Sequence, residues 1–185
     1  MILVDLLHAF YLGVLKSFAT ELVWELIRSQ CWRDRQLYSD QAAFVEAAVQ
    51  LMYSDLISWY TSRAISHPSE RMTRVADFSV SMLGKTTKRK LSLKAAETKM
   101  FFFFLVDRVS VFKDKLLRGD IWPRTCSALC RFIAVLKSEP LRLSDAGLQE
   151  RLGLVETGTR VCFALVLLLA VFHAALATTL TGMFA

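Results

Sequence analysis

The sequence contains no asparagine, only three prolines and only seven glycines among its 185 residues. N-linked glycosylation is therefore excluded, and no stretch has the composition of a flexible linker. The four cysteines, Cys31, Cys126, Cys130 and Cys162, form no CxxC pair and no dense framework. This pattern argues against a disulfide scaffold and favours a reducing, cytosolic environment.

Motifs of catalytic and metal sites are also missing. No HExxH, GxSxG or GxGxxG run occurs, and the three histidines stand far apart in the chain. Ser79–Thr86 (SVSMLGKT) ends like a phosphate-binding loop, but it begins with Ser instead of Gly and no buried strand precedes it. Cys126 and Cys130 lack the further ligands of a zinc site and are interpreted as packed thiols. The sequence thus predicts no enzymatic activity, no cofactor and no metal.

Apolar residues, in contrast, make up 54% of the chain, and the mean hydropathy is +0.38. The longest charge-free run is Val161–Ala185, in which His173 is the only ionisable group. A bilayer-spanning helix needs about 20 apolar residues, so this run predicts a transmembrane anchor. All 23 Lys and Arg precede it, which places the rest of the chain in the cytosol by the positive-inside rule. We assign His173 to helix packing rather than to a proton path.

The N-terminal segment Met1–Ile27 is apolar as well, but four charged residues interrupt it. Its longest uncharged stretch is too short to span a bilayer, and it lacks the basic start of a secretory signal. We predict a helix that lies on a membrane surface or faces a partner, a choice that the sequence leaves open. The polar stretch Arg28–Ser39 should break this helix.

A second helix is predicted between a cap at Ser39 or Asp40 and a stop at His67-Pro68. Apolar residues recur on it at helical spacing, whereas Glu46, Gln50, Ser54 and Ser58 mark another face. The apolar set consists of Phe44, Val45, Val49, Met52, Leu56, Trp59 and Tyr60.

The strongest functional feature is a basic tract, Lys85–Lys99, in which six Lys or Arg accompany a single acid, Glu97. We predict that a helical segment from Ser69 through Leu83 continues into this tract. The part Val80–Lys94 would then lie along the cytosolic leaflet, where each cation gains roughly 1 kcal/mol from anionic head groups. The predicted lipid contacts are Lys85, Lys88, Arg89, Lys90 and Lys94. The alternative is a solvated helical face, and nucleic acid is not an expected partner because no aromatic–basic binding motif occurs.

The remaining segments are also predicted to be helical. Phe101–Val106 is too short to span a bilayer. The charged residues that follow it make the rest of this segment an amphipathic or partly inserted helix, which should stop near Gly119; they are Asp107, Arg108, Lys113, Asp114 and Lys115. Helices should follow at Arg124–Lys137 and Leu141–Arg160. No useful strand pattern appears, so the class is all-α: membrane-associated amphipathic helices with a C-terminal transmembrane helix. The chain accordingly divides into an N-terminal apolar helix with its polar break (1–39), a cytosolic helical region (40–160) and the anchor (161–185).

The order of these segments resembles the peroxisomal membrane-elongation family, peroxin eleven. Gln41–Arg63 is similar to the family's first helix, with Tyr53, Trp59, Tyr60 and Arg63 in matching places. Ser79–Lys94 is similar in character to its basic second helix, although the family's Arg-Lys-aromatic core is not clearly reproduced. Phe102–Leu117 resembles a third signature through Asp107, Phe112 and Lys113, and Leu141–Leu154 resembles the loop before the family's terminal apolar segment.

The resemblance implies a non-enzymatic protein that remodels and elongates the peroxisomal (glycosomal) membrane through amphipathic helices and self-association. Its partners would be anionic lipids and further copies of the chain. A competing interpretation is a structural accessory subunit of a mitochondrial membrane complex, a respiratory-chain or ATP synthase assembly, since such subunits are small, basic and helical. A tail-anchored apoptosis regulator ranks third because the groove signature of that family is missing.

Overall fold

The computed structural model describes residues 10–85, 87–117 and 119–138. The chain divides into two compact units, Met1–Leu129 and Cys130–Ala185, and of the second only the end of one helix is described. The described residues are mostly helical, which confirms the predicted all-α class. The helices are α2 (Leu15–Arg28, preceded by a π-helical turn, Phe10–Val14), α3 (Gln41–Ser66), α4 (Ala95–Phe112) and α5 (Ile121–Ser138). A two-stranded hairpin, β1 (Gly84–Lys85) and β2 (Lys88–Arg89), was not predicted.

Helix α3 confirms the prediction from its local signals. The side chain of Asp40 caps it by accepting a hydrogen bond from the backbone N–H of Ala43, at 3.1 Å. The helix ends at Ser66, directly before His67-Pro68. All seven predicted apolar residues are buried, whereas Glu46, Gln50, Ser54 and Ser58 are exposed.

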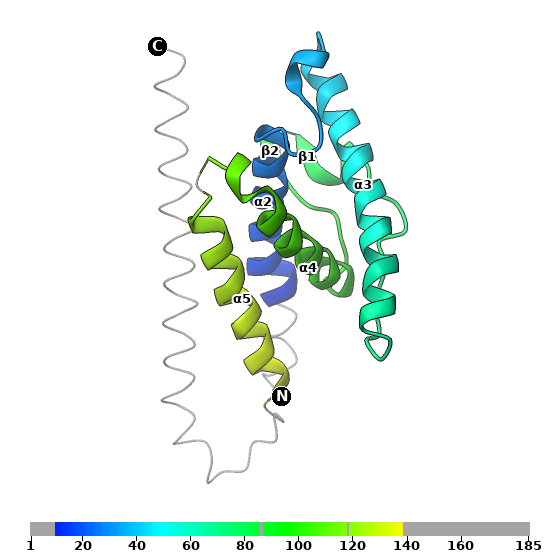
Figure 1. Cartoon of the computed structure of the whole chain (residues 1–185), viewed down its shortest axis with the longest axis vertical. Helices are drawn as coiled ribbons and strands as arrows, with labels where there is room; N and C mark the ends of the chain where they lie inside the picture. The colour runs from blue at the N-terminus through cyan, green and yellow to red at the C-terminus, as the bar shows by residue number, and fades with distance from the viewer. Residues whose placement is uncertain (1–9, 86, 118, 139–185) are drawn as a thin grey trace. The chain divides into compact units, whose positions relative to one another are not determined.

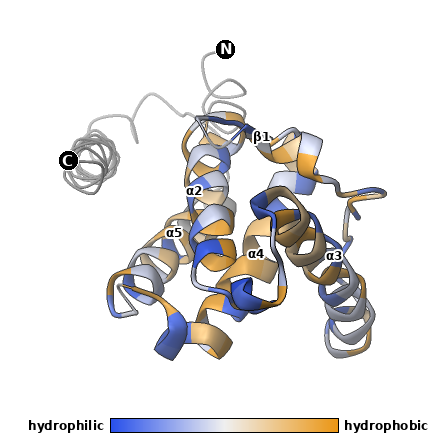
Figure 2. Cartoon of the chain, turned by 90° about the horizontal axis from the view of Figure 1, so that it is seen from above, coloured by the Kyte–Doolittle hydropathy of each residue, from blue (hydrophilic) through white to orange (hydrophobic). Residues whose placement is uncertain are grey.

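Helix α4 lies between α2 and α3 in Figure 1, and the view from above in Figure 2 shows the same order. Its residues Phe101, Phe102 and Phe104 are fully buried. Edge-on ring contacts join Phe102 to Phe18 of α2 and Phe104 to Trp59 of α3. Of the two predicted alternatives, a partly inserted helix is therefore wrong for α4, because neighbouring helices of the same chain cover its apolar surface.

Helix α2 also corrects the sequence interpretation. Ten of its residues are buried, including Leu15, Leu22 and Leu26, which have no exposed surface. Neither a membrane-surface helix nor a partner-facing helix describes residues 10–28, because α4, the hairpin and the start of α5 cover them. From α5, Trp122 packs on Phe18 with ring centroids 5.7 Å apart.

The segment that follows α3 is an extended loop, and the helix predicted from Ser69 does not form. Two tyrosines of α3 hold the loop. The backbone N–H of Val75 donates to Tyr60 Oη at 3.2 Å, and Tyr53 Oη donates to the carbonyl of Ala76 at 2.6 Å. These two backbone groups bond to side chains of α3 and are therefore not available for a helical ladder. A short 3₁₀ turn, Val80–Leu83, leads into the hairpin.

The end of α4 falls at Phe112, before the predicted stop at Gly119, because the chain tightens into a 3₁₀ turn at Lys113–Lys115. Gly119 instead closes the next turn, where a Cβ atom would clash with the carbonyl oxygen of Lys113. Helix α5 includes the predicted Arg124–Lys137. Within residues 10–138 as described, no helix is both long and apolar enough to cross a bilayer. The predicted helix Leu141–Arg160 and the predicted anchor Val161–Ala185 lie outside the described residues.

Candidate functional site

The basic tract folds as a hairpin, and the helix predicted over Val80–Lys94 is wrong. Gly84 has a φ of 70°, a left-handed value that ends the preceding turn and favours glycine. A Cβ atom there would lie 2.6 Å from the carbonyl oxygen of Lys88. Beyond the two short strands the pairing continues, since the N–H of Lys90 donates to the Leu83 carbonyl at 3.0 Å and that of Ser92 to the Met82 carbonyl at 2.8 Å.

Side chains alternate along the extended segment that follows β2. Leu91 and Leu93 are buried, whereas Lys90, Ser92 and Lys94 are exposed. In an extended chain, residues two apart point to the same side. The two lysines and the serine therefore share one outward face, and the two leucines fix the segment to the core.

Four of the five predicted lipid contacts are exposed: Lys85, Lys88, Lys90 and Lys94. Lys85 and Lys88 stand directly opposite each other in the hairpin register, an arrangement in which like charges repel. Within the described part of the chain, none of the four forms a salt bridge with an acid. We call these four residues the lysine face.

The fifth predicted contact, Arg89, is turned inward. Its Nη1 atom lies 2.5 Å from Oε2 of Glu21 on α2, and its guanidinium carbon lies 5.7 Å from the centre of the Trp24 ring. The side chains of Arg89 and Glu21 are only 19% and 11% exposed. The sequence could not reveal this pair, because its members are 68 residues apart.

Two further hydrogen bonds hold the hairpin region to α2. Trp24 Nε1 donates to the Leu83 carbonyl at 3.4 Å, and Lys16 Nζ donates to the Leu93 carbonyl at 2.8 Å. Burial lowers the pKa of Lys16, and the neighbouring Lys90 lowers it further. The lysine face is thus presented by a segment that α2 fixes at three points.

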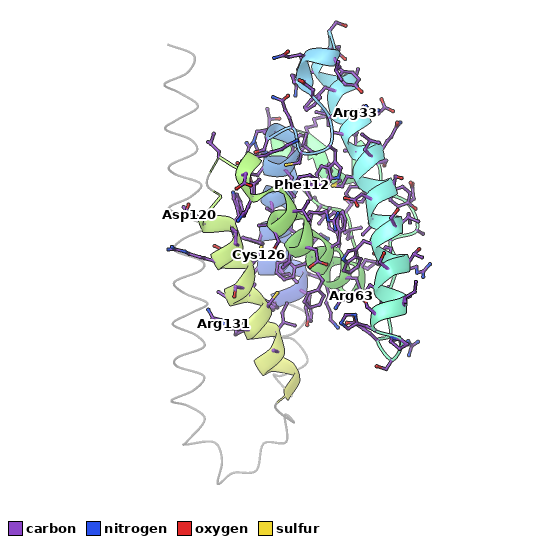
Figure 3. All side chains as sticks on the ribbon, viewed as in Figure 1. Arg33, Arg63, Phe112, Asp120, Cys126 and Arg131 are labelled. Atoms are coloured by element: carbon purple, nitrogen blue, oxygen red, sulfur yellow. The ribbon has the colours of Figure 1, made fainter. Side chains whose placement is uncertain are left out.

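A second polar cluster joins α3 to α4. Trp59 Nε1 donates to Asp107 Oδ2 at 2.5 Å, so two residues that carry the family resemblance meet in space. Arg63 is labelled on α3 in Figure 3. Its guanidinium carbon lies 5.1 Å from the centre of the Trp59 ring of α3 and 5.4 Å from that of the Phe103 ring of α4. Arg63 also forms an ion pair with Glu70 at 2.7 Å. Together these contacts hold α3 against α4, and we call them the interhelical clamp.

Sequence reasoning missed another part of this clamp. Asp55 pairs with Arg108 of α4 at 3.1 Å and accepts a hydrogen bond from Trp32 Nε1, also at 3.1 Å. The Trp32 ring in turn packs edge-on against Phe112. The available signal was Asp55, an acid directly before Leu56 of the predicted apolar set, because a carboxylate beside a buried surface is stabilised by a partner.

An open hollow of about 270 Å³ lies beyond the end of α2. Its lining consists of Ser29, Gln30, Cys31, Trp32, Arg33, Asp34 and Lys115. Burial raises the pKa of the Cys31 thiol to about 12, so the sulfur is protonated and weakly nucleophilic at neutral pH. The described ranges contain no group of three or more His, Cys, Asp or Glu side chains able to hold a metal ion.

No family model, curated protein or solved structure matches this chain.

Proposed function

We propose that this chain is a non-enzymatic protein that remodels and elongates the peroxisomal (glycosomal) membrane, and that the lysine face binds anionic lipid. The observation that carries the proposal is a set of four exposed lysines without acid partners among the described residues, on a segment that α2 holds in place. The order of segments, which resembles that of the peroxisomal family, supports the peroxisomal membrane as the location.

The strength of binding follows from the number of cations. Each lysine near an anionic surface contributes about 1 kcal/mol, so four contribute about 4 kcal/mol. This corresponds to a preference of about a thousandfold for anionic over neutral lipid. Since Leu91 and Leu93 are used in the core, the interaction is electrostatic and weakens with salt.

The hairpin also changes how remodelling would work. A wedge formed by residues 80–94 would need an apolar helical face, which this segment does not have. We therefore attribute membrane deformation to the self-association of many anchored copies, each held to the cytosolic leaflet by its lysine face.

Val161–Ala185 supplies the anchor in this proposal. Its deletion should release the protein from carbonate-washed membranes, since it is the one charge-free run long enough to span. If the shortened protein resists carbonate extraction, another segment holds it in the bilayer.

The lysine face is tested with full-length protein in nanodiscs, using a fluorescent amino acid at the exposed position Thr87 and a head-group quencher in the lipid. We expect stronger quenching in discs with 30% anionic lipid than in neutral discs, and a loss of that difference in molar salt. Changing Lys85, Lys88, Lys90 and Lys94 to Glu should abolish the difference.

A matched control separates local from overall charge. The changes Arg33→Glu, Arg71→Glu, Lys113→Glu and Arg124→Glu alter the net charge by the same amount at exposed positions elsewhere. This variant should keep the preference for anionic discs. The lysine face would be refuted as a lipid site by equal quenching of the unaltered protein in anionic and neutral discs. It would also be refuted if both variants lost the preference for anionic discs to the same extent.

The accessory-subunit interpretation is the second candidate, and the outer face of α3 favours it. The exposed residues of its second half carry no charge, and they include Ile57 and Ile65, which are 41% and 79% exposed. A protein partner that covered this uncharged face would remove the two isoleucine side chains from water. A fluorescent tag at the N-terminus discriminates: peroxisomal tubules support the first proposal and mitochondrial staining the second.

A further inference from the structure

Ser92 lies between Lys90 and Lys94, two residues of the lysine face. It is exposed between the buried residues Leu91 and Leu93, and it shares its outward side with Lys90 and Lys94. In sequence it follows Lys88-Arg89-Lys90-Leu91, with basic residues two, three and four positions before it. Charge patterns of this kind guide the choice of substrate by basophilic serine/threonine kinases.

We propose that Ser92 is a phosphorylation site for a basophilic serine/threonine kinase, and that its phosphate switches off lipid binding by the lysine face. This inference rests on the proposed function. In the modification, Ser92 Oγ forms a bond to the γ-phosphorus of ATP, the bond from that phosphorus to the β-bridging oxygen breaks, and ADP leaves. The hydroxyl proton passes to the base of the kinase.

The charge at this position explains the size of the effect. A phosphoserine carries about −1.5 to −2 at pH 7 and has three strong acceptor oxygens. Lys90 and Lys94 each stand two residues away on the same side, so their ammonium groups would pair with the phosphate. The four positive charges of the lysine face would thereby fall to about two. Phosphorylation inside a basic membrane-binding cluster releases such clusters from anionic lipid.

Other hydroxyls in the hairpin region lack this combination. Thr87 is exposed at the hairpin tip, but Gly84 occupies the position three residues before it. Ser81 is exposed too, yet the residues before it are Phe78, Ser79 and Val80, which carry no charge. Only at Ser92, among these exposed hydroxyls, do the upstream cations and the flanking lysines coincide.

The fold also limits when a kinase can act. Arg89 is paired with Glu21, and the leucines on either side of Ser92 are buried. The kinase therefore has to bind the segment after local opening, when the two backbone bonds from Lys90 and Ser92 have separated. Variants that loosen the hairpin should for this reason be phosphorylated faster. A serine on a freely accessible tail would be phosphorylated at the same rate in such variants.

The first arm of the test locates the site. Full-length protein is incubated with ATP and a purified basophilic kinase, and the modified residue is identified by mass spectrometry. We expect phosphate on Ser92, no incorporation there in the Ser92→Ala variant, and faster incorporation in Glu21→Gln. Absence of phosphate from Ser92, or unchanged total incorporation in Ser92→Ala, would overturn the assignment of the site.

The second arm measures the switch without a kinase. Phosphoserine is installed at position 92 during synthesis, and the nanodisc quenching experiment is repeated with phosphoserine at the exposed α3 position 54 as the control. Each lysine contributes about fivefold to the preference for anionic lipid, so loss of two lowers it about thirtyfold. The control should retain the preference. If the unmodified protein shows no preference for anionic discs, the proposed function fails. If the unmodified protein shows this preference and the phosphoserine 92 protein shows it equally, only the switch is refuted.

Discussion

Replacing Glu21 by Gln should loosen the hairpin while leaving the helical core intact. The amide keeps the shape of the side chain and one acceptor oxygen, but it removes the negative charge that Arg89 contacts at 2.5 Å. The Nε atom of Arg89 is buried and has no hydrogen-bond partner in the described part of the chain, so the guanidinium depends strongly on Glu21.

The expected magnitude follows from the kind of bond that is lost. Hydrogen bonds between ionised partners contribute about 1.5–3 kcal/mol, and a neutral acceptor restores roughly half of that. We therefore expect the free energy of hairpin opening to fall by about 0.8–1.5 kcal/mol, which corresponds to opening about four to thirteen times more often.

Amide hydrogen exchange of the full-length protein measures this opening directly. The amides of Lys90 and Ser92, which donate to the Leu83 and Met82 carbonyls, should exchange about four- to thirteenfold faster. Amides in the middle of α4 should be unchanged. Glu25→Gln is the matched control, because Glu25 pairs with the exposed Arg28 three residues on and such pairs contribute only a few tenths of a kcal/mol. Equal acceleration in both variants, or in α4 as much as in the hairpin, would show that Glu21 does not fasten the hairpin.

Three further changes test the core, the clamp and the buried thiol. Phe101→Ala should lower the free energy of unfolding by about 3–5 kcal/mol in denaturant titrations, because it empties a fully buried site, whereas the exposed Val111→Ala should change it little. Trp59→Phe should cost about 1–2 kcal/mol by removing the donor to Asp107, and a loss below 0.5 kcal/mol would contradict the clamp. Burial raises the pKa of Cys31 to about 12 from about 8.5 in an unfolded chain, so alkylation at pH 8 should be slow until the protein is denatured. Because the folded state holds the Cys31 thiol proton more tightly, ionisation of this thiol should also lower stability as the pH rises above about 8.5. Rapid alkylation of Cys31 itself in the native protein at pH 8, located by mass spectrometry, would contradict this assignment.

The sequence predicted those elements whose signals are local. Helix α3 has its cap in Asp40 and its stop in His67-Pro68, and both act within a few residues of the helix ends. The helix predicted at Arg124–Lys137 lies within α5, which begins three residues earlier, at Ile121. Such signals determine where a helix begins and ends, but they do not show what covers it.

The wrong predictions concern segments whose partners are distant in sequence. The apolar runs of α2 and α4 cover each other, which a single run cannot reveal. The sequence therefore indicated a membrane-surface or partner-facing helix for the first run and an amphipathic or partly inserted helix for the second. The loop after Pro68 bonds to tyrosines of α3, and Arg89 bonds to Glu21 across 68 residues. A local signal for the extended segment did exist: Lys90 to Lys94 alternates charged or polar with leucine, the period of a strand rather than a helix.

The separation in sequence between α2 and the residues that pack on it also affects folding during synthesis. The bond from Lys16 to the Leu93 carbonyl spans 77 residues, and the rings that cover Phe18 come from Phe102 and Trp122. At about 5–20 residues per second, the ribosome needs about 4–15 s to produce that intervening chain. During this interval α2 leaves the ribosome with its apolar surface uncovered. Early protection by a chaperone is therefore important for α2, and a chain that terminates before α4 would be prone to aggregate.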